Sequence, residues 1–204
     1  MLYEMRIYTC GSHQIPGYIE KFSEVFERRQ KISRVIGFFR IEIGELNRVM
    51  HIWEYEDVAH RERVRKEAME QPWWPPDIEG IVRRQENKLM TTPPFRPEPL
   101  LGNLGDVYEV RTYTIQVRKM GEVVSRYIQH VPPREELSPI SACFITDSGP
   151  MNEFIHMYPY KDLNHRAQIR QKASKLPNWP PGGHPFYEHQ KTEIWIPTSF
   201  SLMH

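Results

Sequence analysis

Cysteine is scarce in this sequence, since Cys10 and Cys143 are the only two among 204 residues. Two cysteines are too few for the disulfide framework of a small secreted domain, and neither belongs to a metal-type ligand spacing. His51 and His156 each stand without a second histidine or cysteine nearby, so they carry no metal signature either. We therefore expect no metal site.

The chain also lacks an excess of charge of one sign and lacks long apolar runs. It has 27 basic and 26 acidic residues, a net charge of +1, so no strong field favours nucleic acid or a membrane surface. No apolar run approaches the roughly 18 residues that span a bilayer, and residues 1–6 have strand pattern rather than signal-peptide layout. We expect a cytoplasmic protein without membrane insertion. No Gly-rich phosphate loop and no Ser/His/Asp set stands out.

A long internal repeat is present instead. Residues 47–61 recur as residues 152–166, with Asn, His, Tyr, Asp, His and Arg at the same six places and an offset of 152 − 47 = 105. The first strand repeats at the same offset, because Tyr3-Glu4-Met5-Arg6 is matched by Tyr108-Glu109-Val110-Arg111. A duplication this regular indicates two copies of one structural unit.

Each copy has the order β-α-β-β-α-β. Alternating and helical hydrophobic patterns predict strands at 2–9, 38–43, 48–56 and 85–91 and helices at 15–32 and 57–69. The second copy predicts strands at 108–114, 142–147, 152–160 and 189–196, a helix from Met120 and another at 162–174. Proline and glycine gather between the copies. The predicted organisation is a first repeat at 1–92, a linker at 93–105 and a second repeat at 106–204.

This order is that of the ferredoxin-like unit, whose four-stranded sheet is covered by helices on one face only. The other face needs a partner, and two copies in one chain can supply it by forming an α+β barrel. We assign the apolar faces, such as Tyr3/Met5/Ile7, to the helices. The polar faces would then line a shared barrel interior; they comprise Glu4, Arg6, Tyr8, His51, Trp53 and Tyr55, with Glu109, Arg111, Tyr113, His156, Tyr158 and Tyr160.

Two interpretations of these polar faces stay open. Buried charges are costly unless they are paired, so the residues could satisfy one another in a network such as Glu4 with Arg6, closed by tyrosine and histidine. Alternatively, they line a pocket and meet a ligand there.

The chain resembles the NIPSNAP family. The resemblance rests on Tyr3-Glu4-Met5-Arg6-Ile7-Tyr8-Thr9, on Gly37-Phe38-Phe39 with Glu42-Ile43-Gly44, and on Asn47-Arg48-Val49-Met50-His51-Ile52-Trp53-Glu54-Tyr55. Both halves fit, so the chain is similar to a tandem member. The resemblance implies a ferredoxin-like, dimeric α+β barrel fold and implies no catalytic residues.

Candidate chemistry centres on the two histidines. His51 and His156 are candidate general bases, Tyr8 and Tyr113 candidate hydrogen-bond donors, and Arg6 and Arg111 candidate anchors for a carboxylate. Binding contacts are expected from Glu4, Trp53, Tyr55, Tyr158 and Tyr160. The alternative is that each histidine fixes strand register by hydrogen bonding.

Other repeated residues have simpler interpretations. We expect Asn47 and Asn152 to adopt turn conformations. His60-Arg61 and His165-Arg166 would form a solvated helix face or a contact between the halves. The Trp73-Trp74-Pro75-Pro76 and Trp179-Pro180-Pro181 loops could be lids over the barrel mouth, oligomer contacts or packing at a sheet edge.

The sequence thus predicts a barrel that binds small molecules or proteins, forms a homo-oligomer and needs no cofactor, although haem held by one histidine is an alternative. A second hypothesis is a cofactor-independent monooxygenase or isomerase acting on a small aromatic or carboxylated metabolite.

Overall fold

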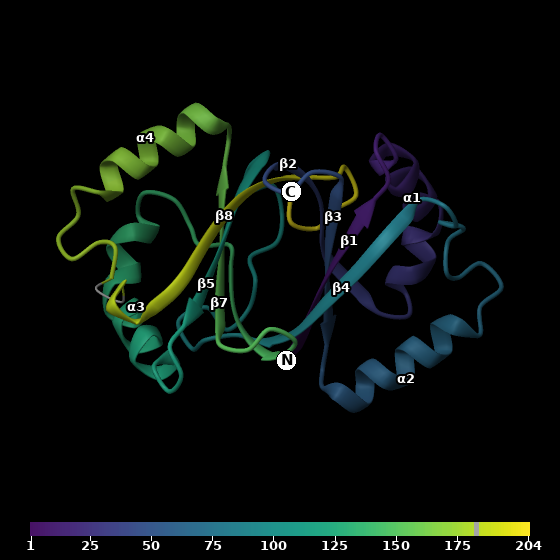
Figure 1. Cartoon of the computed structure of the whole chain (residues 1–204), viewed down its shortest axis with the longest axis horizontal. Coiled ribbons are helices and arrows are strands. Elements are labelled where there is room, and N and C mark those ends of the chain that lie inside the picture. The colour runs from purple at the N-terminus through teal and green to yellow at the C-terminus, as the bar shows by residue number, and fades with distance from the viewer. Residues whose placement is uncertain (182–183) are drawn as a thin grey trace.

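The computed structural model describes residues 1–181 and 184–204 and consists of two similar halves (Figure 1). The first half contains β1 (Leu2–Cys10), α1 (Ile15–Gln30), β2 (Arg34–Ile43), β3 (Arg48–Tyr55), α2 (Val58–Met69) and β4 (Val82–Thr91). The second contains β5 (Val107–Ile115), α3 (Met120–Glu135), β6 (Ala142–Ser148), β7 (Glu153–Tyr160), α4 (Leu163–Ala173), the 3-10 turn η1 (His184–Phe186) and β8 (Tyr187–Pro197). The predicted order is confirmed in both halves.

The largest difference from the predicted strands lies at β2. It begins at Arg34 rather than 38, because Val35 already pairs with Trp53 of β3. Gly37, expected to precede the strand, lies inside it at a shift of register. A side chain there would meet the Phe39 ring, since an added Cβ would stand 2.6 Å from Cε2 of Phe39. Glycine therefore permits the irregular pairing that lets β2 start early.

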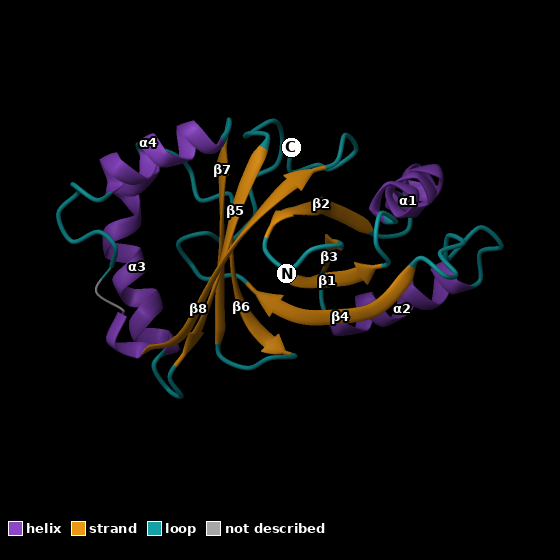
Figure 2. Cartoon of the chain, turned by 45° about the horizontal axis from the view of Figure 1, so that its top comes forward, coloured by secondary structure: helices purple, strands orange, loops and turns teal. Residues whose placement is uncertain are grey.

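The eight strands close into one barrel in the order β1-β3-β2-β8-β5-β7-β6-β4 (Figure 2). Each half supplies four neighbouring strands, and two seams join the halves. At one seam β2 pairs with β8, and at the other β4 pairs with β6. All pairings are antiparallel. The predicted α+β barrel of two ferredoxin-like units is confirmed.

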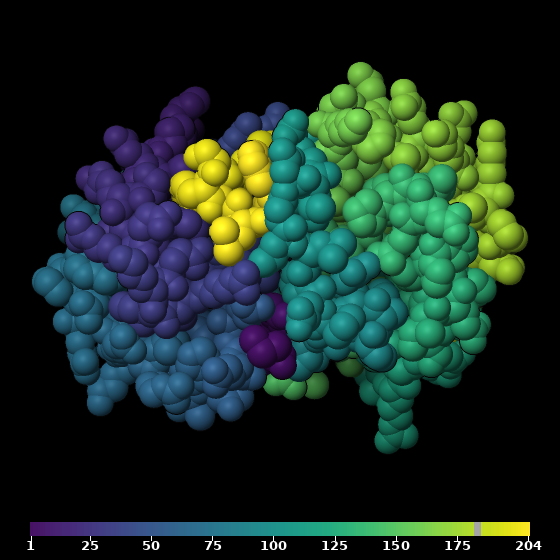
Figure 3. Space-filling model, turned by 180° about the vertical axis from the view of Figure 1, so that it is seen from behind, coloured from purple at the N-terminus to yellow at the C-terminus, as the bar shows by residue number. Residues whose placement is uncertain are grey.

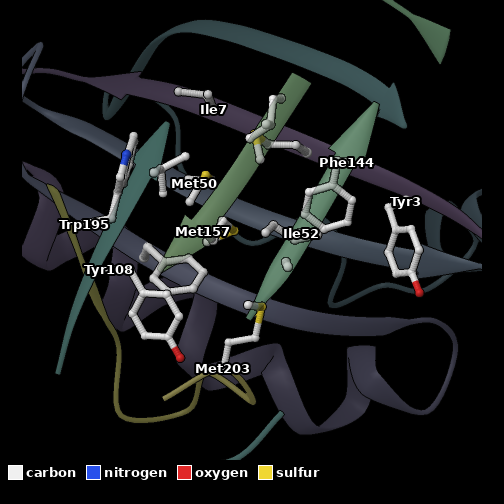
Figure 4. Packing of buried hydrophobic residues seen from close by; sticks show 14 of the residues in the cluster. Tyr3, Ile7, Met50, Ile52, Tyr108, Phe144, Met157, Trp195 and Met203 are labelled. Carbon is white, nitrogen blue, oxygen red and sulfur yellow. The ribbon is translucent and has the colours of Figure 1, made fainter. Parts of the chain in front are cut away.

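The barrel interior is apolar. One buried cluster takes side chains from all eight strands, which only the enclosed face of a closed barrel can do; Figure 4 shows Tyr3, Ile7, Met50, Ile52, Tyr108, Phe144, Met157 and Trp195 from this cluster. Two further clusters each draw their buried residues from one half and include residues of α1 or α3. Tyr8, Trp53 and Tyr55 belong to the first of these helix-side clusters.

The assignment of the two sheet faces from the sequence was therefore wrong. Tyr3, Met5 and Ile7 point into the barrel, whereas Glu4, Arg6 and Tyr8 point outward toward the helices of their own half. The same reversal holds for His51 and His156, which lie in separate halves instead of a shared interior. The physical reason is access to water: the enclosed face has none, while the helix-covered face borders solvent where the helices part.

Each half is also covered by a segment that belongs to the other. Phe200, after β8, packs against Phe22, Phe26 and Phe38 of the first half. Phe95, its counterpart at the 105-residue offset, stacks on Tyr127 of the second half. Figure 3 shows the yellow C-terminal segment lying against the first half. Residues after β4 and after β8 thus complete the opposite half.

Local turns follow the predicted chemistry. Asn47 and Asn152 have φ values of 60° and 58°, the left-handed conformation that asparagine tolerates, and each precedes the third strand of its half. Asp57 caps α2, because its carboxylate accepts a hydrogen bond from the His60 backbone N–H at 2.7 Å. Asp162 caps α4 in the same way. No helix in the described part of the chain has the length and apolarity needed to cross a membrane.

Replacing Asp57 with alanine tests the cap. The substitution leaves the first backbone N–H groups of α2 without their side-chain acceptor, and we expect it to lower the free energy of unfolding by about 1 kcal/mol. Urea denaturation followed by circular dichroism measures the change. Asp57→Asn keeps a side-chain oxygen at the same place and should unfold close to wild type; equal loss in both variants would contradict the cap.

Candidate functional site

The candidate site is a cavity of about 360 Å³ between the sheet of the first half, α1, α2 and the loop that follows α2. Aromatic and apolar side chains form most of its wall; they are Tyr8, Tyr18, Phe22, Trp53, Met69, Trp74, Pro75, Pro76 and Ile78. The polar lining consists of Arg6, Arg29, His51, Arg65 and Gln85. The cavity thus combines aromatic faces with three guanidinium groups and no carboxylate.

His51 lies at the base of this cavity and is almost fully buried. Its Nδ1 accepts a hydrogen bond from the Trp53 indole N–H at 2.7 Å, and its Nε2 lies 3.4 Å from the Tyr18 hydroxyl. Because an indole N–H can only donate, Nδ1 carries no proton and Nε2 carries the proton of the neutral ring. Burial lowers the pKa of His51 well below its usual range, and the positive charge of Arg6 lowers it further.

Glu4 is the fully buried anion beside the cavity. Its Oε1 accepts hydrogen bonds from Arg61 at 2.6 Å and Asn87 at 3.1 Å, and its Oε2 accepts from Arg6 at 3.2 Å and Tyr55 at 3.3 Å. Burial alone would raise the pKa of Glu4, but the Arg61 hydrogen bond and the charges of Arg6 and Arg61 outweigh it and lower the pKa. Glu4 is therefore committed to a structural network.

Arg29 is the unusual cation of the site. It is 2% exposed and stacks over Trp53 and Trp74, with ring centroids 4.5 and 4.9 Å from its guanidinium carbon. Its Nε and Nη1 have no hydrogen-bond partner in the described structure. Burial lowers the pKa of Arg29 to about 10, so it remains charged at neutral pH. A buried guanidinium with free donors is a binding group for an anion.

The second half repeats the framework with less space. Glu109 accepts from Arg111, Arg166 and Arg170, and the hollow beside it measures about 120 Å³. Arg134, the counterpart of Arg29, donates to the Ser138 carbonyl oxygen and the Tyr160 hydroxyl. Its guanidinium is thus occupied by the protein itself.

The histidine of the second half also differs in its contacts. His156 Nδ1 lies 3.1 Å from the Tyr158 hydroxyl, and its Nε2 is buried without a partner in the described part. Tyr127 stands where the first half has Phe22, and Val123 stands where it has Tyr18. The two halves therefore share a framework but offer different sites.

The structure brings together several of the predicted site residues and separates others. Arg6, Tyr8, His51 and Trp53 line one cavity, with Glu4 and Tyr55 hydrogen-bonded beside it. Arg111, Glu109, Tyr158 and Tyr160 line the smaller hollow of the second half, and Tyr113 accepts a hydrogen bond from Arg111. Trp74 and Trp179 cover these outer sites rather than the barrel mouth.

Sequence reasoning missed Arg29, Tyr18, Arg61 and Arg65 as site residues. Arg61 was expected on a solvated face or at a contact between halves, but it pairs with buried Glu4 of its own half. A signal existed, because Arg61 and Arg65 stand one helical turn apart and recur as Arg166 and Arg170. Among the described residues, no group of three or more His, Cys, Asp and Glu could hold a metal.

Replacing Glu4 with glutamine should destabilise the fold by about 3 kcal/mol, since the surrounding arginines lose their buried counter-charge. The lowered pKa of Glu4 also makes the free energy of unfolding depend on pH. The wild-type carboxylate stabilises the fold above its unfolded pKa of about 4.3, and this contribution is lost as the pH falls through the folded value. Urea unfolding at pH 7 and at pH 3 should therefore differ less for Glu4→Gln than for wild type. Exposed Glu20→Gln is the control and should match wild type.

The His51 ring should remain neutral across physiological pH. Long-range ¹H–¹⁵N spectra are expected to show a protonated Nε2, an unprotonated Nδ1 and constant shifts from about pH 8 to about pH 5, a range in which an exposed histidine titrates. Imidazole dissolved in the same buffer is the reference. A His51 signal that titrates with the reference would contradict the described burial and tautomer.

Comparison with known proteins gives the chain a family. A family model described as NIPSNAP matches residues 3–97 and again residues 108–202. The NipSnap homolog of Dictyostelium discoideum is 26% identical over 182 residues, which cover 87% of this chain and 78% of the relative. The human NipSnap homolog 3A is 24% identical over 216 residues, covering 98% and 85%.

A solved structure resembles the whole barrel. A proposed monooxygenase from Fusobacterium nucleatum superposes with a TM-score of 0.69 and covers 96% of this chain and 91% of its own, at 11% sequence identity. At this identity the likeness shows the fold alone. The two matches to the family model account for nearly the whole chain, in which the family unit occurs twice in tandem. The protein therefore belongs to the NIPSNAP family.

Proposed function

We propose that the first half binds a small aromatic carboxylate in the cavity beside His51. The observation that carries this proposal is Arg29, whose side chain lines the cavity while its buried Nε and Nη1 are unpartnered in the described structure. A buried donor left without an acceptor costs free energy, and a carboxylate oxygen would recover it.

The charge around the cavity supports an anionic ligand. Arg6, Arg29 and Arg65 line it, whereas its lining contains no aspartate or glutamate. Glu4 lies nearby and pairs with Arg6 and Arg65 as well as with Arg61, so one carboxylate serves three guanidinium groups. Arg29 is the lining cation without an acidic partner among the described residues, and a negative group placed against it would compensate its charge in a site of reduced dielectric.

The shape of the cavity supports a flat ligand. Its volume of about 360 Å³ falls within the range of small-molecule sites. Tyr18, Phe22 and Trp74 present ring surfaces to it, and aromatic rings pack well in offset or edge-to-face contact. The carboxylate would lie at Arg29 while the ring occupies the aromatic wall.

A second candidate function is cofactor-independent turnover of such a ligand. It is supported by His51, Arg6 and Tyr8 lining the same cavity. An isomerase would remove one proton from carbon and return it elsewhere on the ligand. A monooxygenase would combine a ligand CH₂ group with O₂ to give C=O and water. In either case the Trp53 N–H occupies the Nδ1 lone pair of His51, so that bond would have to break before Nδ1 could accept a proton.

Oligomer formation and a cytoplasmic location stay predictions. The sequence predicts that the sheet face without helices needs a partner in each half. One chain covers this face by itself, because both seams of the barrel join its own halves. Any homo-oligomer would therefore use an outer surface.

Calorimetric titration with benzoate and 1-naphthoate tests the proposed ligand class. We expect both carboxylates to bind and the neutral amides of the same rings to bind far more weakly. Arg29→Met should weaken carboxylate binding about 10- to 100-fold, the effect of losing a hydrogen bond to a charged group. It should leave the weak amide binding unchanged, because the charge-neutral ring contacts remain.

Arg28→Met is the matched control, since Arg28 is exposed on the same helix and lies outside the cavity. Equal binding of carboxylates and amides, or equal losses in the Arg28 and Arg29 variants, would refute the proposal. Incubation in air with phenylpyruvate, an aromatic carboxylate that has the CH₂ group both reactions require, separates the two functions when a protein-free sample is run beside it. Unchanged ligand supports binding alone, and an isomerised or oxygenated product supports turnover.

A further inference from the structure

Six charged side chains gather at one end of the barrel interior, apart from the outer cavity. The first half contributes Arg48, Glu86 and Lys88, and the second half contributes Glu153, Lys191 and Glu193. Five of them line one hollow of about 170 Å³ together with the interior residues Met5 and Ile7, and Glu193 pairs with Arg48. We call these six residues the charged ring.

Two ion pairs of the ring cross between the halves. Arg48 of β3 contacts Glu193 of β8 at 3.0 Å, and both side chains are at most 6% exposed. Lys88 of β4 contacts Glu153 of β7, and both are partly buried. Each pair reaches across one seam strand, β2 in the first case and β6 in the second. The pairs therefore act where the halves meet.

The two ion pairs occupy equivalent positions in the repeat. At the repeat offset of 105, Arg48 corresponds to Glu153 and Lys88 corresponds to Glu193. Glu86 likewise corresponds to Lys191. All three ring positions thus have opposite charge in the two halves, although the strands around them repeat closely. The first half contributes two positive charges and one negative, and the second half contributes the reverse.

We infer that the charged ring selects the partner of each half: a first half fits a second half and is repelled by another first half. Two first halves in one barrel would set Arg48 opposite the Lys88 of the other copy at both seams. Two second halves would set Glu153 opposite Glu193 at both seams. Like charges facing each other in a partly buried interface disfavour the wrong pairing, while the barrel built from one chain is neutral in the ring.

The inference explains how a duplicated unit avoids pairing with its own kind. Both halves carry the same strand order and similar apolar interiors, so apolar burial alone gives little discrimination between a barrel of unlike halves and a barrel of like halves. Pairing of like halves between two chains would give dimers with one barrel from two first halves and one from two second halves. The charged ring opposes both of those barrels at once.

The test uses the full chain and exchanges one pair, Lys88→Glu with Glu153→Lys. Every facing pair within one chain stays opposite in charge, so the single-chain barrel is retained. However, in a barrel of two first halves, Arg48 of one copy would now face a glutamate at position 88 of the other. In a barrel of two second halves, a lysine at position 153 of one copy would likewise face Glu193 of the other. The variant therefore keeps the pairing of its own two halves and loses the repulsion between like halves of two chains.

A sixfold variant is the matched control. Adding Arg48→Glu, Glu86→Lys, Lys191→Glu and Glu193→Arg to the first two substitutions inverts the whole ring, which keeps the contacts of residues 48 with 86 and 191 with 193 opposite in charge and restores repulsion between two like halves. Each protein is unfolded in guanidinium chloride, refolded at high protein concentration and analysed by size-exclusion chromatography with light scattering. A sample that was never unfolded gives the baseline for any other self-association.

We expect wild type and the sixfold variant to return to their baseline, and the twofold variant to give about tenfold more dimer. A twofold variant that gives no more dimer than wild type overturns the inference, as does a sixfold variant that gives as much as the twofold. If the twofold variant does not fold, Lys88→Gln with Glu153→Gln replaces it. This neutral pair also removes the repulsion, so an unchanged dimer fraction in it overturns the inference too.

Discussion

A sheet that closes on itself has one face with no route to water, and the rest of this structure is arranged around that face. All eight strands contribute apolar side chains to it, so charged groups on that face are tolerated only at the two ends of the barrel. The charged ring pairs its members at one end, and Arg34 pairs with Glu54 at the other. The remaining charged residues of the strands must lie on the outer face. There Glu4 is fully buried, and Arg61 reaches from α2 to neutralise it.

The outer face then becomes the place where the halves diverge. The interior must fit both halves at once, which leaves little freedom for substitution. Each outer site is built almost entirely by one half, so it can change alone. In the first half Arg29 stacks between two tryptophans and keeps free donors, whereas in the second half Arg134 is bound by Tyr160 and Ser138. The same framework thus gives one open site and one nearly filled one.

The sequence was sufficient for the fold because the repeat marks every element twice. It was insufficient for the faces, since alternation shows that a strand has two faces but not which one is enclosed when both are buried. Glu4, Arg6 and His51 were grouped correctly and assigned to the wrong side. Arg29 was missed, because Arg28-Arg29 resembles any solvated helix end. The repeat holds one signal, since Arg29 recurs as Arg134 whereas Arg28 is replaced by Pro133, but the role of Arg29 depends on its contacts with Trp53 and Trp74, which are distant in sequence.

The exchanged segments have a consequence for how the protein is made. Phe200 completes the aromatic cover of α1 and β2. The Ser201 hydroxyl oxygen accepts a hydrogen bond from the Phe38 N–H, and the Met203 N–H donates one to the Ile36 carbonyl oxygen. A ribosome delivers these residues only after the whole second half. During synthesis, Phe22, Phe26 and Phe38 of the first half therefore lack their contact with Phe200 until translation is nearly complete. Phe95, in contrast, is already present when the second half emerges. The first domain to be translated is the last to be finished.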